Sequence, residues 1–90
     1  MHHVRAEVHG RVQGVGFRWF AVKRAGEHGV RGFVRNLAGG SVEVVAEGER
    51  GALEAFLEDL RSGPRGARVE HVELNWSEGP GEYPGFGIEG

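Results

Sequence analysis

The stretch VRAEVHGRVQGVGFRWFAVKRAGEHG, residues 4–29, decides how the chain begins to fold. Apolar and polar residues alternate up to His9, which is typical of a half-buried strand. Three glycines then follow within seven residues and interrupt that period. Apolar side chains recur at helical spacing from Phe17 to His28, and Gly29 is a typical helix stop. The stretch therefore predicts a strand, a glycine-rich loop and a helix in succession.

The rest of the chain predicts the remaining elements of a small α+β fold. Its patterns favour strands over residues 30–37, 41–47, 68–76 and 86–88. One apolar face predicts a second helix from Arg50 to about Ser62. The order is β-α-β-β-α-β with a short extra C-terminal strand, which is the ferredoxin-like sandwich. In that fold, two helices cover one face of a mostly antiparallel sheet. The predicted core comprises Val4, Val8, Phe20, Val34, Val42, Val44, Leu53, Phe56, Leu57, Leu60, Val72, Leu74, Phe86 and Ile88.

Length and composition narrow the classes of protein that fit. Ninety residues predict a single domain over residues 1–90. No apolar run approaches the ~18–20 residues that span a bilayer, so we expect no membrane partner. The absence of cysteine excludes disulfides and thiolate metal sites, and it favours a cytoplasmic location. The net charge of −2 disfavours a nucleic-acid partner, and a covered small core favours a monomer.

The glycine-rich loop is the strongest candidate for a binding site. A helix N-terminus presents unpaired N–H groups and the positive end of the helix dipole, which together attract anions. Arg18 lies in the first turn of the predicted helix, where a cation is unfavourable for the dipole, so its presence suggests a functional reason. The loop N–H groups could surround phosphate oxygens while the Arg18 guanidinium binds two of them. The expected phosphate-binding residues are Gln13, Gly14, Val15, Gly16, Phe17 and Arg18.

Two alternatives to these assignments remain open at this point. The loop matches neither the Walker A nor the dinucleotide-binding pattern, so it could be a plain turn beside an exposed arginine. Asn36 ends the second predicted strand on the side that the helices cover, and the topology brings it beside the loop. Its amide could bind a ligand or a water molecule, or it could simply close the turn that follows.

Two segments of the sequence resemble the signatures of the acylphosphatase family. Residues 8–18, VHGRVQGVGFR, resemble the first signature. Residues 32–36, GFVRN, followed by residues 40–44, GSVEV, resemble the second. The resemblance covers the whole chain, including the closing residues 85–88, GFGI.

The resemblance implies hydrolysis of an acyl phosphate to a carboxylate and inorganic phosphate, with no metal and no cofactor. Arg18 is then expected to bind the phosphoryl group, and Asn36 to orient the attacking water. The amides of residues 13–18 would complete the phosphate cradle. Phe33 stands where a tryptophan is common in the family, and Gly39 where an acidic residue is frequent. Neither departure touches the expected chemistry.

The histidines, the tryptophans and the third strand could be signs of other kinds of site or function. None of the five histidines forms a ligand pair by linear spacing, so no metal site is expected. Trp19 could cover the site or lie partly exposed, and Trp76 is expected to pack at the core or the sheet edge. The alternative function is a non-catalytic RNA-binding or small-ligand regulatory module. The third strand, residues 41–47, has no aromatic side chain to stack on a base, which argues against RNA binding.

Overall fold

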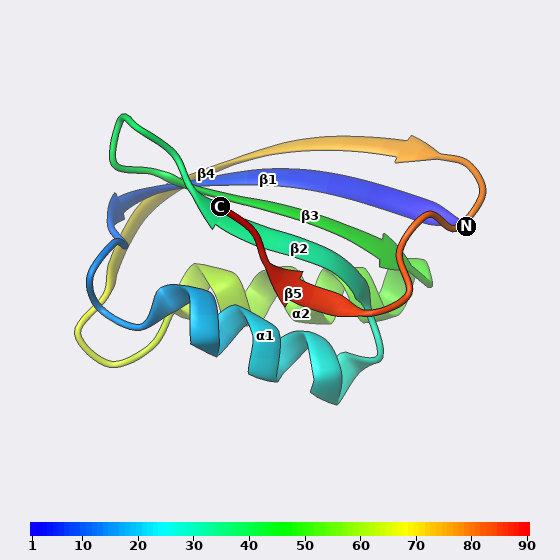
Figure 1. Ribbon diagram of the computed structural model, residues 1–90, viewed down its shortest axis with the longest axis horizontal. Helices are drawn as coiled ribbons and strands as arrows, with labels where there is room; N and C mark the ends of the chain where they lie inside the picture. The colour runs from blue at the N-terminus through cyan, green and yellow to red at the C-terminus, as the bar shows by residue number, and fades with distance from the viewer.

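The computed structural model describes residues 1–90, and its elements follow the predicted order (Figure 1). They are β1 (His2–Arg11), α1 (Phe17–His28), β2 (Arg31–Asn36), β3 (Val42–Gly48), α2 (Arg50–Ser62), β4 (Arg68–Glu78) and β5 (Phe86–Ile88). The sheet order is β4-β1-β3-β2-β5, and only β2 and β5 pair in parallel. Both helices lie against one face of the sheet, so the predicted architecture is confirmed. Neither helix combines the length and the apolar composition needed to cross a membrane.

The first strand is longer than its sequence pattern predicts. β1 extends to Arg11, so the first two residues of the expected loop belong to the strand. Gly10 pairs with β4 through a bulge, where the register shifts between His9 and Gly10. A Cβ atom at Gly10 would lie 2.1 Å from the carbonyl oxygen of Arg68, and φ is +126°. A glycine here therefore permits close strand pairing rather than ending the strand.

The core lies between the sheet and the two helices. All four predicted core residues of β1 and β3 are buried, as are Val34 of β2 and all four of α2. The side chains that are only half-buried belong to α1 and the two edge strands: Phe20, Val72, Leu74, Phe86 and Ile88. An edge strand has a neighbour on one side only, so part of each side chain stays exposed. The list of predicted core residues leaves out four small buried residues that allow close packing, namely Ala6, Ala21, Ala25 and Ala46.

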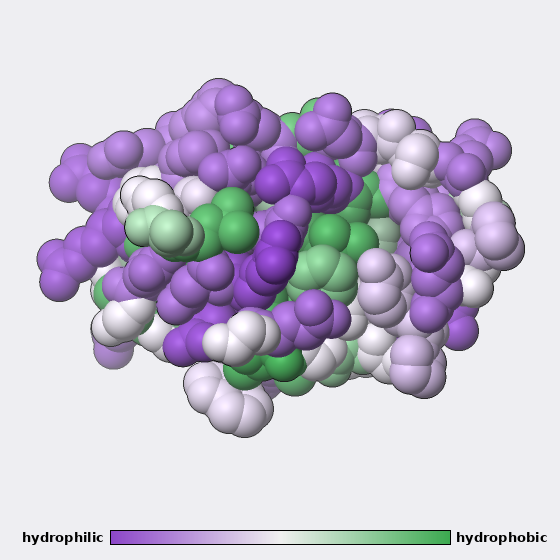
Figure 2. All heavy atoms as spheres, turned by 45° about the horizontal axis from the view of Figure 1, so that its top comes forward, coloured by the Kyte–Doolittle hydropathy of each residue, from purple (hydrophilic) through white to green (hydrophobic).

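The face of the sheet opposite the helices is largely charged. Figure 2 is turned toward this side, and hydrophilic side chains cover most of the visible surface. Glu43 is buried on this face and accepts hydrogen bonds from Arg5 and Arg35 on the neighbouring strands. Burial alone would raise the pKa of Glu43, but the two arginines outweigh it and hold the pKa below its ordinary value. The ion pairs thus keep this face of the sheet polar, and the apolar core lies on the face that the helices cover.

Candidate active site

The loop between β1 and α1 is anchored at both ends by buried side chains. Val12 and Phe17 are each only 1% exposed. Between them, Gly14 and Gly16 adopt left-handed φ values of +74° and +79°, whereas Val15 does not have a positive φ. Such alternation makes successive backbone N–H groups line a concave anion-binding surface. A Cβ atom at either glycine would meet nothing within 4 Å, so the outer side of the loop is open.

The backbone N–H groups of this loop are free. None of those from residues 13–19 donates a hydrogen bond to a protein acceptor, and the next, from Phe20, donates to the carbonyl of Gly16 at 3.0 Å. The helix geometry accounts for the free groups in its first turn, and the loop adds those before it. No acidic residue lies in the first turn of α1. The positive end of the helix dipole is therefore not neutralised by the protein, which favours an anionic ligand.

Arg18 differs from every other basic residue of the chain. It is half-buried and forms no ion pair. The other basic residues without a carboxylate partner are all exposed, namely Arg11, Lys23, Arg65 and Arg68. A partly desolvated guanidinium without a partner gains most from binding an anion with two parallel hydrogen bonds.

Asn36 is held near the loop by a contact that the sequence did not reveal. The side-chain amide of Gln13 donates to the carbonyl oxygens of Leu37 and Ser41, at 2.8 Å and 2.9 Å. These bonds tie the loop to the β2–β3 turn directly after Asn36, and both segments lie at the same end of the molecule (Figure 1). The expected proximity of β2 and the loop is thus confirmed, although only the backbone of Gln13 was expected to act. Because long-range partners leave no local pattern, no signal in the sequence marked this side chain.

The turn after Asn36 closes without its side chain. Leu37 N–H donates to Ser41 at 2.9 Å, and Gly40 N–H donates to Leu37 at 3.1 Å. The Asn36 side chain is exposed at the end of β2, on the same side as the buried Gly32 and Val34. Its amide is therefore available to a ligand or a water molecule, which weakens the alternative that it serves the turn.

Three further side chains complete the local picture. Ser41 Oγ donates to a carboxylate oxygen of Glu7 at 2.7 Å, and this hydrogen bond lowers the pKa of Glu7. Trp19 is 72% exposed, so it does not form part of the core. Trp76 is half-buried beneath the guanidinium of Arg50, at 3.7 Å from the ring centre, in agreement with the expected packing at the sheet edge.

A ferredoxin-like sheet that carries a loop of free N–H groups and an unpaired arginine favours the class of small domains that handle anionic groups. The family model described as "Acylphosphatase" matches residues 4–88. An acylphosphatase of Thermus thermophilus is 59% identical over 84% of this chain and 86% of its own length. The crystal structure of acylphosphatase from Bacillus subtilis is 36% identical and covers 99% of both chains, with a TM-score of 0.96. The structure of HypF from T. kodakarensis is 38% identical with a TM-score of 0.86, over 99% of this chain and 12% of that one.

This chain belongs to the acylphosphatase family. It is an enzyme that hydrolyses acyl phosphates, as the resemblance of its two signatures implies. Its substrate is a small molecule, and phosphate is a product. The non-catalytic RNA-binding or regulatory alternative is not favoured by these findings.

Proposed function

We propose that the enzyme cleaves its substrate by in-line attack of water on phosphorus, without a metal or cofactor. The loop amides of residues 13–18 and the guanidinium of Arg18 hold the phosphoryl group, and the side-chain amide of Asn36 orients the water. One observation carries the proposal: Arg18 is the only cation that is both half-buried and unpaired, and it lies beside a run of free N–H groups.

Substrate binding follows from the charges around the loop. A phosphoryl group brings negative charge to free N–H donors, a helix N-terminus and a guanidinium, which all favour it. These donors are held by a backbone whose ends are buried, so they do not have to reorganise as the reaction proceeds. Because the equatorial oxygens carry the charge of the transition state, fixed dipoles around them lower the barrier. Gly14 and Gly16 leave the outer side of the loop open to the ligand.

The chemical step needs little acid–base assistance. The water oxygen forms a bond to phosphorus while the bond between phosphorus and the acyl oxygen breaks, and the carboxylate leaves with that electron pair. A carboxylate is a good leaving group and requires no general acid. An asparagine amide does not take up a proton at neutral pH, so Asn36 acts by alignment and a phosphoryl oxygen accepts the proton of the water. The products are a carboxylate and inorganic phosphate.

The same proposal covers the organisation of the protein. Residues 1–90 act as one acylphosphatase-like domain that works as a monomer in the cytoplasm, without a nucleic-acid partner. The family match over residues 4–88, the charged open face and the net charge of −2 support this. Light scattering on the purified chain and a gel-shift assay with RNA test the monomer and the absence of nucleic-acid binding.

The decisive experiment is hydrolysis of benzoyl phosphate in the presence of excess chelator. We expect the wild-type enzyme to remain active and Asn36→Ala to lose turnover, with little change in the binding of inorganic phosphate. Asn75→Ala is a matched control, because Asn75 is exposed on β4 and outside the proposed site. Full turnover by Asn36→Ala would show that this side chain does not position the water.

A second pair of variants tests the phosphate contact. Arg18→Ala should weaken phosphate binding and also slow turnover, because the contact tightens in the transition state. Arg18→Lys should restore only part of the loss, since an ammonium group cannot make the bidentate contact. Arg65→Ala, which removes an exposed unpaired arginine, is the control. Unchanged phosphate affinity in Arg18→Ala would exclude the guanidinium from the site.

A further inference from the structure

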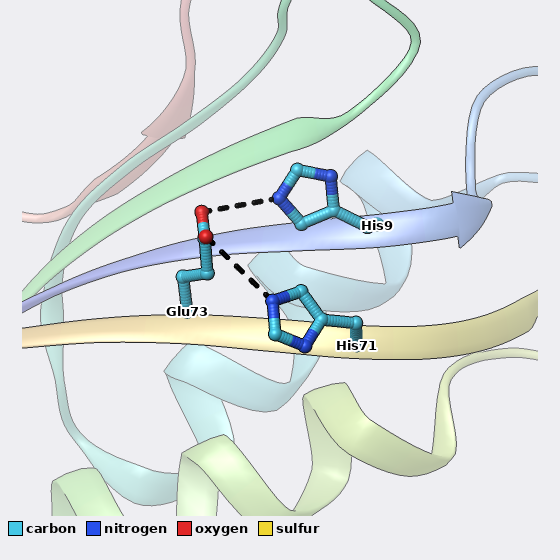
Figure 3. Close-up of side chains that lie close together, drawn as sticks. All are labelled: His9, His71 and Glu73. Carbon is cyan, nitrogen blue, oxygen red and sulfur yellow. Dashed lines mark hydrogen bonds and ion pairs between the residues drawn. The ribbon is translucent and has the colours of Figure 1, made fainter.

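Two histidines and a carboxylate meet on the open face of the sheet, outside the proposed active site. His9 on β1 lies directly opposite His71 on β4, and Glu73 is two residues along the same strand. Because alternate residues of a strand share a face, all three side chains point the same way. Figure 3 shows the two imidazoles turned toward the Glu73 carboxylate. Their ligand atoms all lie within 4.8 Å of one another.

The spacing of these atoms is close to that of a metal coordination shell. His9 Nε2 is 3.3 Å from one carboxylate oxygen of Glu73, and His71 Nε2 is 3.6 Å from the other. In a tetrahedral site with bonds of about 2.0–2.1 Å, neighbouring ligand atoms are separated by about 3.3 Å. Small rotations of exposed side chains would bring all three onto one ion. Two imidazoles and a carboxylate form a donor set that suits Zn²⁺ and leaves a fourth position for water.

The local charges also favour a cation. Glu7 on β1 lies directly opposite Glu73 in the register, and like charges in that position repel. The Glu7 carboxylate is 3.6 Å from His9 Nε2, so both carboxylates flank the same imidazole. A metal ion between the histidines and Glu73 would offset this repulsion.

A second group of possible ligands is already committed to the fold. It consists of His3, Glu47 and Glu82. Glu47 is fully buried and accepts hydrogen bonds from the backbone N–H groups of Glu82 and Tyr83. His3 Nε2 lies 3.0 Å from the carbonyl oxygen of Pro80. The His9–His71–Glu73 cluster has no such backbone bonds, and its side chains are 37%, 60% and 56% exposed.

From this geometry we infer that His9, His71 and Glu73 form a surface site for a divalent transition-metal ion, with Zn²⁺ as the ion that fits best. Each imidazole binds through Nε2 in the tautomer that carries its proton on Nδ1, and Glu73 supplies one oxygen. None of the three residues belongs to the phosphate-binding loop, so the site is independent of the proposed hydrolysis.

The test is calorimetric titration of the full chain with zinc chloride in a phosphate-free buffer at about pH 7.5, where ordinary imidazoles are mostly neutral. We expect one zinc ion per chain in the wild type and an affinity lower by about tenfold or more in His71→Ala, since even the loss of an outer partner costs about 10–100-fold. His2→Gln, which removes another surface imidazole, is the matched control and should bind zinc as the wild type does.

Imidazole NMR signals add a second readout that does not depend on affinity. Zinc should shift the ring resonances of His9 and His71 and leave those of His28 unchanged. The absence of zinc binding by folded wild-type protein would overturn the inference. So would binding that persists in His71→Ala but disappears in His3→Ala, because the ion would then occupy the other cluster.

Discussion

Removal of the Gln13 side chain tests whether one contact holds the two halves of the proposed active site together. In Gln13→Ala, the β1–α1 loop loses both hydrogen bonds to the β2–β3 turn. Each neutral hydrogen bond contributes about 0.5–1.5 kcal/mol. Both carbonyls keep a second donor, because Gly40 N–H bonds Leu37 and Leu37 N–H bonds Ser41. The expected loss of folding stability is therefore moderate, about 1–2 kcal/mol, or about 4–16 °C in Tm for a domain of this size.

The effect on catalysis should exceed the effect on stability. The two bonds set the distance between the β1–α1 loop and the segment that carries Asn36. A displacement of reacting groups by about 1 Å can lower a rate by about a hundredfold. We expect kcat for benzoyl phosphate to fall by about ten- to a hundredfold, with a smaller change in the inhibition constant of inorganic phosphate. Urea unfolding and steady-state kinetics on the same preparation measure both effects.

A control separates loss of positioning from general loss of stability. His28→Ala removes a hydrogen bond between His28 Nε2 and Asp59 Oδ2, which are 2.6 Å apart at the opposite end of α1 from the loop. It should lower stability by about 1 kcal/mol without changing kcat. If Gln13→Ala loses stability but keeps the turnover of the His28→Ala control, the contact does not position the site and the reasoning fails.

Three other predictions concern the loop and the buried carboxylates. Gly14→Val forces a β-branched residue to φ +74° and crowds the open side of the loop. Inhibition by inorganic phosphate should therefore weaken far more than in the control Gly29→Val, which imposes similar strain at the other end of α1. Because the pKa of Glu43 is held below its ordinary value of 4.5, its ionised form stabilises the fold above that pH. This contribution is lost as the pH falls through the lowered pKa. In urea unfolding at a series of acidic pH values, the unfolding free energy of Glu43→Gln should therefore fall less steeply than that of the wild type. Glu47→Gln places an amide against two N–H donors and Arg31, and should lower the unfolding free energy by about 2–4 kcal/mol in the same assay; a loss below that of a typical surface substitution would contradict it.

Local sequence signals predicted the elements because each depends on neighbours in the chain. The start of α1 at Phe17 and its stop at Gly29 agree with the structure, as does β5 over residues 86–88. The predictions that were wrong concern positions where strand pairing decides the length of a strand or the burial of a side chain. Gly10 was expected to end a strand, and only its partner across the bulge keeps it within β1. Val72 alternates with polar residues as a core residue does, but it is only half-buried because β4 lies at the edge of the sheet.

Some features of the candidate site could likewise be predicted from the sequence, and others are apparent only in the structure. Arg18, Asn36 and the glycines of the loop were expected from local pattern and from family resemblance, and their roles remain proposals that the experiments above test. That Arg18 lacks a carboxylate partner is visible only once every strand and helix is in place. The Gln13 contact and the pairing of His9 with His71 join residues far apart in the chain.

By itself, the sequence determined the order of the elements, the glycine-rich loop and the residues that resemble those of the family, because periodicity, glycine φ preferences and motif spacing are local properties. The tertiary structure alone decided which charges remain unpaired, which polar side chain ties the loop to β2, and which imidazoles meet across two strands. These depend on register and topology, which bring distant residues within hydrogen-bonding or coordination distance, and no local pattern encodes such distances.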